Sequence, residues 1–305
     1  MIQPITKLVQ ITPPTADALR SFNLTDKSGM FALRDQLESD IDEWCRKAFD
    51  DGPRSHLGAS LIGADCDRHI WYSWRWFKHK IFPGRMQRLF QDGHWYEDRI
   101  IEMLRGIGCT YTQVTEDGQQ QTISAVDGHF GGSTDGLMLL PERYGMGAIP
   151  FLGEFKTAND KSFSKFHDVE FSKPQHWAQT SVYGFKNGLR YGFYFVVNKN
   201  DADMKIELLQ LDWALAERLI NKADWIIHSL VPPPKISANP SYFACKFCDH
   251  HKVCQLGEAP DVNCRTCKHS EPIADKQWRC NRWNIAIPNK KAMLAGCTGH
   301  ELIVT

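Results

Sequence analysis

Residues 129–158 read HFGGSTDGLMLLPERYGMGAIPFLGEFKTA and contain two long strand-like stretches. The first is HFGGSTDGLMLL, the second is AIPFLGEFKTA, and the PERYGMG segment between them has the composition of a turn. Two shorter strand-like stretches precede them, TYTQVT at 110–115 and QQQTISAV at 119–126, with turns at EDG and VDG. This order predicts a strand meander in the middle of the chain.

Two helices are predicted before the meander. Residues 27–50 carry apolar side chains at helical spacing, and a second helix is predicted at 86–106, where Gly106 and Gly108 stop it. The apolar set of the first helix consists of Phe31, Leu33, Leu37, Ile41, Trp44 and Phe49.

Further elements are predicted after the meander. A helix follows Pro174, a residue suited to the first helical turn, and a nearly continuous apolar run at 190–197 predicts a buried strand. Residues 204–212 alternate like a half-buried strand, and an amphipathic helix follows at 213–230. The predicted class is therefore mixed α/β, with a central mixed β-sheet flanked by helices.

Composition excludes several classes of protein. The chain has 305 residues, of which 42% are hydrophobic and 24% are charged, as in ordinary globular proteins. It contains no apolar run of the roughly 20 residues that a membrane span needs, and its start does not look like a secretory signal. We expect a soluble, cytoplasmic protein that does not act at a membrane. The 36 basic and 36 acidic residues exclude a wholly basic nucleic-acid coat but allow a local basic patch.

Ten cysteines are many for an intracellular chain and indicate metal binding rather than disulfides. Residues 259–305 contain a spacing typical of a small structural zinc module, in which a metal ion would compensate for a minimal core. Its cysteines are Cys264, Cys267, Cys280 and Cys297, with His269 and His300 nearby. His300 could replace one cysteine, and other groupings of the late cysteines stay open.

A second cysteine set combines the early Cys66 with Cys245-x2-Cys248-x5-Cys254. Four thiolates can bind either a 4Fe–4S cluster or Zn²⁺, and the spacing does not separate the two. The two remaining thiols, Cys45 and Cys109, are expected to be packed side chains.

Three residues of the meander could form a site. Glu154 and Lys156 are two apart on a strand and so share one face, while Phe155 points the opposite way, into the core. Asp135 on a neighbouring strand would complete a cluster of two carboxylates and one lysine. Carboxylate oxygens suit Mg²⁺ or Mn²⁺, and a lysine beside the metal could orient or deprotonate an attacking water. The simpler alternative is a turn aspartate and ordinary surface alternation.

The helix after Pro174 places His176, Gln179 and Tyr183 on one face. By itself this could be an ordinary polar helix face.

Taken in order, D-x18-E-x-K followed by Q-x3-Y resembles the PD-(D/E)XK nuclease superfamily, and specifically its RecB-like iron–sulfur exonuclease branch. The resemblance implies a restriction-endonuclease-like core with a metal held by Asp135, Glu154 and the Phe155 carbonyl. It assigns Lys156 to catalysis and places Gln179 and Tyr183 against DNA or the active site. The branch also has an upstream helical histidine that binds the metal. The matching residue here is His94, with Glu97 one turn later.

The resemblance extends to the first cysteine set. Cys66, Cys245, Cys248 and Cys254 look like the iron–sulfur staple of AddB-type helicase-nucleases and CRISPR-associated exonucleases, which favours iron over zinc. The C-terminal cysteine tail resembles those of phage-type proteins. The expected organisation is an N-terminal helical region at 1–57, a nuclease core at 58–258 closed by the cluster, and the zinc module at 259–305.

A basic segment between residues 68 and 91 lacks acidic residues and interleaves cations with aromatic side chains. Such a segment could contact phosphates and stack on bases, or it could be an amphipathic helix with aromatic residues in the core. We favour core packing for the aromatics and phosphate contacts for the cations. The cations are Arg68, Arg75, Lys78, Lys80, Arg85 and Arg88.

The predicted function is a metal-dependent DNA exonuclease that hydrolyses phosphodiester bonds in recombination, repair or degradation. Its partners would be DNA ends and a recombination or helicase protein, because the chain has no G-x4-GK[ST] motif of its own. A phage-encoded protein would act in the host cytoplasm. One alternative is a non-cutting DNA-binding or recombination partner protein on the same fold. Another is an iron–sulfur or zinc protein that acts as a redox sensor or interaction module.

Overall fold

The computed structural model describes residues 27–115 and 118–303. The chain divides into two compact units. One comprises Met1–Asp50 with Phe82–Arg88, and the other comprises Asp51–Ile81 with Leu89–Thr305. Among the helices of the described ranges, none is both long and apolar enough to cross a membrane.

The smaller unit contains α2 (Lys27–Ala48), which confirms the predicted first helix. Asp42 connects this helix to the start of α5 (Gly84–Gly106), because its carboxylate pairs with Arg88 at 3.0 Å and accepts a hydrogen bond from the Gly84 N–H. The predicted apolar residues do not form a core here. Phe31, Leu33, Leu37, Ile41 and Trp44 are all exposed.

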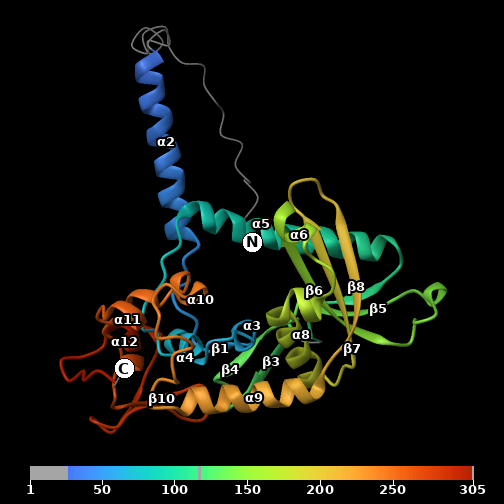
Figure 1. Ribbon diagram of the computed structural model, residues 1–305. Coiled ribbons are helices and arrows are strands. Elements are labelled where there is room, and N and C mark those ends of the chain that lie inside the picture. The colour runs from blue at the N-terminus through green and yellow to red at the C-terminus, as the bar shows by residue number, and fades with distance from the viewer. Residues whose placement is uncertain (1–26, 116–117, 304–305) are drawn as a thin grey trace. The chain divides into compact units, whose positions relative to one another are not determined.

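The larger unit is built on a mixed sheet of five strands in the order β2-β5-β6-β7-β8. Its strands are β2 (Thr110–Thr112), β5 (Gly136–Leu139), β6 (Pro150–Ala158), β7 (Tyr191–Asn198) and β8 (Met204–Gln210). The β6–β7 pair is parallel and the other pairs are antiparallel. The predicted mixed sheet is thus confirmed (Figure 1).

A parallel pair requires a crossover connection, and here it contains three helices. These are α6 (Asp160–Ser164), α7 (Val169–Ser172) and α8 (Pro174–Lys186), the last of which begins at Pro174 as predicted. The amphipathic helix α9 (Trp213–His228) follows β8, and the Asp212 side chain caps it by accepting from the Leu215 N–H.

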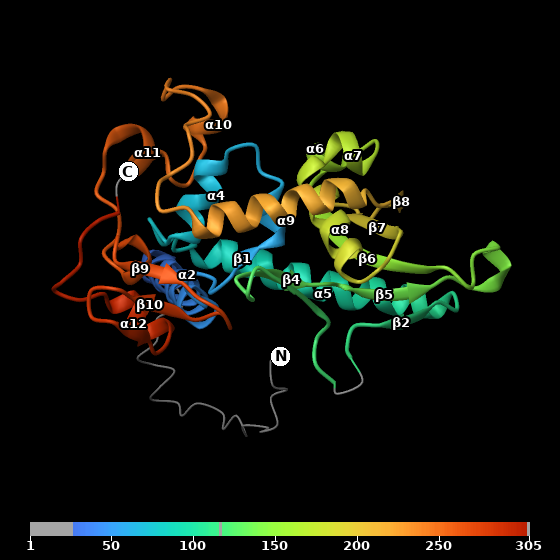
Figure 2. The same ribbon diagram turned by 90° about the horizontal axis from the view of Figure 1, so that it is seen from below.

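Helices cover both faces of the sheet (Figures 1 and 2). The C-terminal half of α5 buries Ile100 and Leu104 against Phe155 and other aromatic side chains on one face. Leu152 and neighbouring apolar residues pack with Val182 of α8 and the buried side of α9 on the other face. The alternation along β6 therefore buries Phe155 toward α5, as predicted, and directs Glu154 and Lys156 toward α8.

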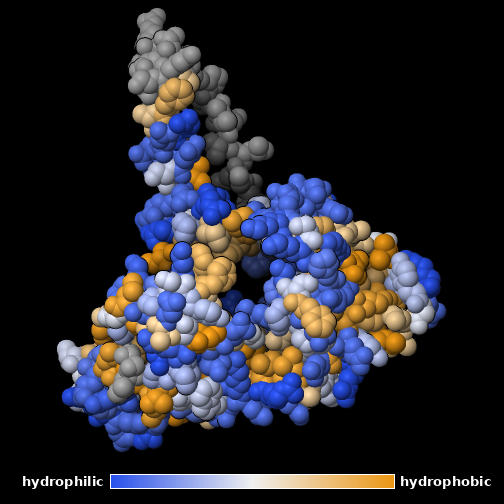
Figure 3. Space-filling model, viewed as in Figure 1, coloured by the Kyte–Doolittle hydropathy of each residue, from blue (hydrophilic) through white to orange (hydrophobic). Residues whose placement is uncertain are grey.

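The edge strand β8 is only half covered. Its Leu209 is buried, whereas Ile206 and Leu208 are exposed on the alternate positions. Figure 3 shows hydrophobic surface at this side of the main sheet.

Two small sheets complete the larger unit. One pairs β1 (Leu57–Gly58) with β4 (Phe130–Ser133) and β4 with β3 (Thr122–Ala125). The other consists of β9 (Ser270–Pro272), β10 (Trp278–Cys280) and β11 (Ile285–Ile287). Short helices lie between these strands: α3 (Ala59–Ile62), α4 (Asp67–Trp74), α10 (Phe243–Lys246), α11 (His251–Leu256), α12 (Lys290–Ala295) and the 3-10 turns Glu142–Tyr144 and Cys264–Thr266.

The stretch HFGGSTDGLMLL differs from its prediction as one strand. The structure divides it into β4 and β5, which belong to different sheets, and the break falls at Thr134-Asp135. Gly136 makes the break feasible because its φ of 145° lies where side-chain-bearing residues are strained. The break matters because it places Asp135 outside the regular pairing.

The C-terminal residues pack into the same core as the sheet. Arg265 is buried and its guanidinium lies 3.9 to 4.7 Å from the ring centroids of three tryptophans. These are Trp74, Trp76 and Trp278. Arg265 also donates hydrogen bonds to the carbonyl oxygens of Trp74 and Ser55. The described residues 259–303 belong to the same compact unit as the main sheet, and a metal-binding module at 259–305 stays a prediction.

We predict that Arg265→Met lowers the free energy of unfolding by about 2–4 kcal/mol, because the buried Trp74 carbonyl oxygen and the Ser55 carbonyl oxygen lose their donor and the tryptophans lose a desolvated cation. Urea unfolding at pH 7 measures the change. The control Arg218→Met removes an exposed arginine of α9 and should change stability by less than about 0.5 kcal/mol. Equal stability of the two variants would contradict this account of the core.

Candidate active site

Asp135 lies in the break between β4 and β5, and its main chain is held on both sides. The Tyr111 hydroxyl donates a hydrogen bond to the Asp135 carbonyl oxygen. On the other side, a Cβ on Gly136 would lie 2.7 Å from the Thr112 carbonyl oxygen, so only glycine fits. The main chain at Asp135 is therefore fixed in a position from which the side chain points toward β6.

The Asp135 carboxylate meets the main chain of β6. Pairing between β5 and β6 ends at Gly136 and Gly153, but β6 continues to Ala158. The Phe155 N–H lies beyond that pairing and donates to Asp135 Oδ2 at 2.7 Å. One carboxylate oxygen thus accepts the hydrogen bond that a neighbouring strand would otherwise accept.

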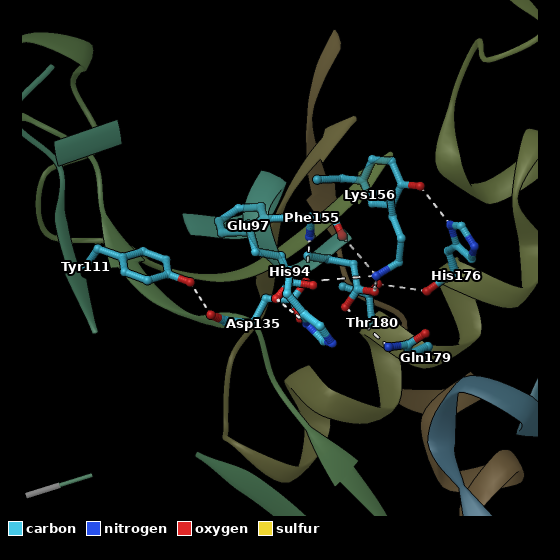
Figure 4. A network of polar contacts seen from close by, with 11 residues as sticks. His94, Glu97, Tyr111, Asp135, Phe155, Lys156, His176, Gln179 and Thr180 are labelled. Carbon is cyan, nitrogen blue, oxygen red and sulfur yellow. Dashed lines mark hydrogen bonds and ion pairs between the residues drawn. The ribbon is translucent and has the colours of Figure 1, made fainter. Parts of the chain in front are cut away.

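Glu154 and Lys156 form the second part of the cluster, and Figure 4 shows Lys156 beside Phe155 and Asp135. The Glu154 side chain is fully buried and forms an ion pair with Lys156 Nζ. Lys156 Nζ also lies 3.9 Å from Asp135 Oδ2 and donates to the Phe155 carbonyl oxygen at 3.1 Å. The predicted convergence of two carboxylates and one lysine is therefore present in the structure.

Burial and charge set the protonation of this pair. Burial raises the pKa of Glu154 to about 7, although the adjacent lysine opposes the shift. Burial alone would lower the pKa of Lys156, but the Glu154 and Asp135 carboxylates outweigh it and raise that pKa. The two carboxylates thus favour the ammonium form of Lys156, which can donate hydrogen bonds, and the predicted role of this lysine toward water stays a prediction.

Helix α8 supports the cluster from one side. Gln179 Nε2 lies 3.5 Å from Glu154 Oε2. Tyr183 is buried, and its hydroxyl lies so close to Gly132 that a Cβ there would be 2.3 Å away. Of the two residues predicted to contact DNA or the active site, Gln179 reaches the carboxylate and Tyr183 packs below it.

His176 forms a second layer beside Lys156. Its Nδ1 lies 2.7 Å from the Tyr194 hydroxyl, and Thr180 donates to the His176 carbonyl oxygen at 2.7 Å. Burial, with a contribution from Lys156, lowers the pKa of His176 to about 4, so the ring is neutral at pH 7. The ring can therefore accept a hydrogen bond from the Tyr194 hydroxyl and hold that side chain in place.

Helix α5 contributes His94 and Glu97 on the other side of Asp135 (Figure 4). The His94 side chain is 68% exposed and lies 3.8 Å from Glu97 Oε2. Burial raises the pKa of Glu97 to about 7, and the Asp135 carboxylate adds to the shift. Glu97 is therefore close enough to Asp135 to be coupled to it, whereas His94 faces solvent.

The donor set fits a divalent cation of the hard class. It offers two carboxylates and the Phe155 carbonyl oxygen, and the buried Glu154 Oε1 has the Lys156 ammonium group as its partner. Within residues 27–115 and 118–303, no group of three or more His, Cys, Asp and Glu side chains is arranged to hold a metal ion. His94 is thus not brought into a three-ligand cluster with the two carboxylates.

The early and late cysteines of the first set meet in space. Cys66, Cys245, Cys248 and Cys254 line one cavity of about 340 Å³. His69 and His250 also line it, and Cys248 Sγ lies 3.4 Å from His69 Nδ1. The fold therefore brings Cys66 to the cysteines that follow α9, although the thiols do not stand in a ligating arrangement.

The C-terminal cysteines line a much smaller cavity. Cys264, Cys267, Cys280 and Cys297 surround a space of about 20 Å³, together with His269 and His300. Burial raises the pKa of Cys264 to about 11, and the three neighbouring thiols add to the shift. The fold therefore brings the four cysteines around one common space.

Three of the six cations of the basic segment pair with acidic side chains. Arg75 is fully buried and donates to the carbonyl oxygens of Ser270 and Ser229, so its predicted phosphate contact is wrong. The other basic residues have the following partners: Lys78 pairs with Glu258 and Asp261, Lys80 with Asp249, and Arg88 with Asp42, while Arg68 donates to the Pro233 carbonyl oxygen and Arg85 is exposed. The tryptophans of this segment, Trp71, Trp74 and Trp76, are core residues, as favoured above.

No protein-family model matches the sequence, and no curated protein matches it. The crystal structure of LHK-Exo in complex with dAMP is similar with a TM-score of 0.38 and 15% identity, covering 60% of this chain and 89% of that chain. A second structure of LHK-Exo, an alkaline exonuclease from Laribacter hongkongensis, has a TM-score of 0.38 and 15% sequence identity. The match covers 60% of this chain and 90% of that chain. The structure of SSO0001 has a TM-score of 0.38 and 12% sequence identity, and the match covers 72% of this chain and 96% of that chain. Similarity at this level does not determine the activity of this chain.

We predict that Glu97→Gln stabilises the protein at pH 8 relative to the wild type but not at pH 5. The folded state raises the pKa of Glu97 to about 7, so the carboxyl favours folding below its unfolded pKa and loses that contribution as the pH rises through 7. Thermal unfolding without added divalent cations should show a gain of roughly 2–4 °C at pH 8. Glu102→Gln, an exposed position on the same helix, serves as the control and should show no such trend. A pH-independent difference for Glu97→Gln would contradict the burial of its carboxyl.

Proposed function

We propose that the protein is a metal-dependent DNA nuclease, and more specifically an exonuclease that hydrolyses phosphodiester bonds. The observation that carries the proposal is the arrangement of Asp135, Glu154 and Lys156 around the main chain of Phe155. Two hard carboxylates and a carbonyl oxygen can bind Mg²⁺ or Mn²⁺, and an adjacent ammonium can contact a phosphate. This combination suits hydrolysis of a charged ester.

The side chains divide the work in the proposed reaction. Asp135, Glu154 and the Phe155 carbonyl would hold the cation, which when bound supplies Lewis acidity and a more acidic water. Lys156 would donate to a phosphoryl oxygen as negative charge develops there. Gln179 would keep Glu154 oriented, and the exposed His94 could turn toward the scissile phosphate or its metal.

We also propose that the two cysteine sets bind different metals. The cavity of about 340 Å³ at Cys66, Cys245, Cys248 and Cys254 has room for a 4Fe–4S cluster. The space of about 20 Å³ among Cys264, Cys267, Cys280 and Cys297 has room for a single ion, and Zn²⁺ prefers such a sulfur set. Both sites would stabilise the fold, because metal binding contributes to the free energy of folding.

DNA with free ends would be the substrate, and recombination, repair or degradation would be the setting. Unwinding of duplex would come from a partner helicase, since the chain has no phosphate-binding loop of that kind.

We predict that Lys156→Ala lowers the rate of DNA cleavage by about 10²–10³-fold, because the developing charge on the phosphate loses its nearest cation. End-labelled linear DNA and closed circular DNA are incubated with Mg²⁺ or Mn²⁺ and anaerobically purified protein. Lys186→Ala removes an exposed lysine of α8 and should retain full activity.

Loss of linear DNA with survival of circles would identify an exonuclease. Cleavage of both would identify an endonuclease and would contradict the finer proposal. A wild-type protein that binds DNA but cuts none with either metal would contradict the nuclease and favour the non-cutting DNA-binding protein.

We predict that protein purified without oxygen contains four iron atoms and one zinc ion per chain by elemental analysis. Cys66→Ser should lose iron and retain zinc, and Cys280→Ser should do the reverse, so each variant controls for the other. Cys109→Ser, at a buried thiol outside both sets, should retain both metals. Zinc in place of iron in the wild type, or joint loss in every variant, would contradict the assignment.

A further inference from the structure

A cavity of about 370 Å³ lies between α5 and the C-terminal ends of β6 and β7. Four of its residues, Asp92, Trp95, Tyr96 and Arg99, follow one another at helical spacing on a single face of α5. Thr157 of β6 and Lys199, which follows β7, line the opposite wall. The cavity therefore combines residues from three parts of the larger unit.

The cavity adjoins the proposed active site through two elements. Thr157 directly follows Lys156 on β6, about 3.3 Å further along the strand, and alternation places its side chain with Phe155 on the α5 face. On α5, Glu97 directly follows Tyr96 and lies beside Asp135 (Figure 4). A DNA strand bound at the cluster of Asp135 and Glu154 could therefore continue along α5 into this cavity.

An exposed aromatic side chain lies at the cavity wall. Trp95 is 58% exposed, whereas the adjacent Tyr96 packs partly against the core under the sheet. The two tryptophans of α4, Trp71 and Trp74, are by contrast fully buried. An indole that is held by a helix and left open to solvent offers a flat surface on which an unpaired base can stack.

The charge at the cavity is positive. Arg99 and Lys199 are both exposed, and neither forms an ion pair within the part of the chain that the structure describes. Asp92 is the one acidic side chain among the lining residues named above, so two cations face one carboxylate. This differs from the basic segment, where Lys78 and Lys80 pair with carboxylates. Free cations of this kind suit phosphate groups.

We propose that this cavity binds a nucleotide of single-stranded DNA next to the bond that is cut. The Trp95 indole stacks on the base, and Arg99 and Lys199 contact the flanking phosphates. Stacking on the indole requires a base that is free of its partner, so the subsite selects single strands or frayed ends over paired duplex. The inference rests on the proposed nuclease and adds the form of its substrate.

The test measures binding of a fluorescein-labelled 12-mer of thymidylate by fluorescence anisotropy, in buffer without added divalent cations. Trp95→Ala should weaken binding by about 5- to 150-fold, the range for loss of one base–aromatic stack, and Trp95→Phe should retain most of it. The double variant Arg99→Ala/Lys199→Ala should reduce the slope of log affinity against log salt by about 1.4, or 0.7 for each phosphate contact. Trp95→Ala should leave that slope unchanged.

Matched controls separate these effects from general surface changes. Trp225→Ala removes an exposed tryptophan of α9, and Lys186→Ala/Arg218→Ala removes two exposed cations elsewhere in the unit. Both should bind as the wild type does. Circular dichroism checks that each variant folds.

Affinities of the cavity variants within twofold of the controls would overturn the subsite while leaving the nuclease intact, because wild-type cleavage is measured separately. An equal loss of affinity for blunt duplex would overturn the preference for single strands. A wild-type protein that neither binds nor cuts DNA would overturn the proposed function itself.

Discussion

The hydrogen bond from the Phe155 N–H to the Asp135 carboxylate connects the fold to the candidate active site. It exists because β5 ends its pairing with β6 at Gly153, whereas β6 continues for five more residues to Ala158. An unpaired N–H of a buried strand needs an acceptor, and the carboxylate supplies one. The same contact holds Asp135 beside Glu154 and Lys156, so the end of a strand pair creates the site.

The cluster also depends on the two different faces of the sheet. Phe155 packs toward α5, which anchors the strand, while Glu154 and Lys156 face α8, where Gln179 reaches the carboxylate. Burial makes charge on Glu154 costly and raises its pKa, and Lys156 compensates in part. A buried carboxylate of this kind is a position where a divalent cation would replace the lost hydration.

Much of this site could be predicted from the sequence, because strand alternation alone places Glu154 and Lys156 on one face and Phe155 on the other. The break at Asp135 could not, since it depends on how β4 and β5 join separate sheets. Nor could the role of Tyr111, because register between strands is not visible in a single sequence. The ion pairs of the basic segment could not be predicted either, because partners such as Lys80 and Asp249 are far apart in the sequence.

The central claim is that Asp135 and Glu154 hold a divalent cation, and titration of Mn²⁺ followed by electron paramagnetic resonance tests it most directly. The account predicts that the wild type binds Mn²⁺ at this site and that Asp135→Asn loses this binding. Asp201→Asn, in the loop between β7 and β8, should bind as the wild type does. Unchanged binding in Asp135→Asn, or no bound Mn²⁺ in the wild type, would contradict the account.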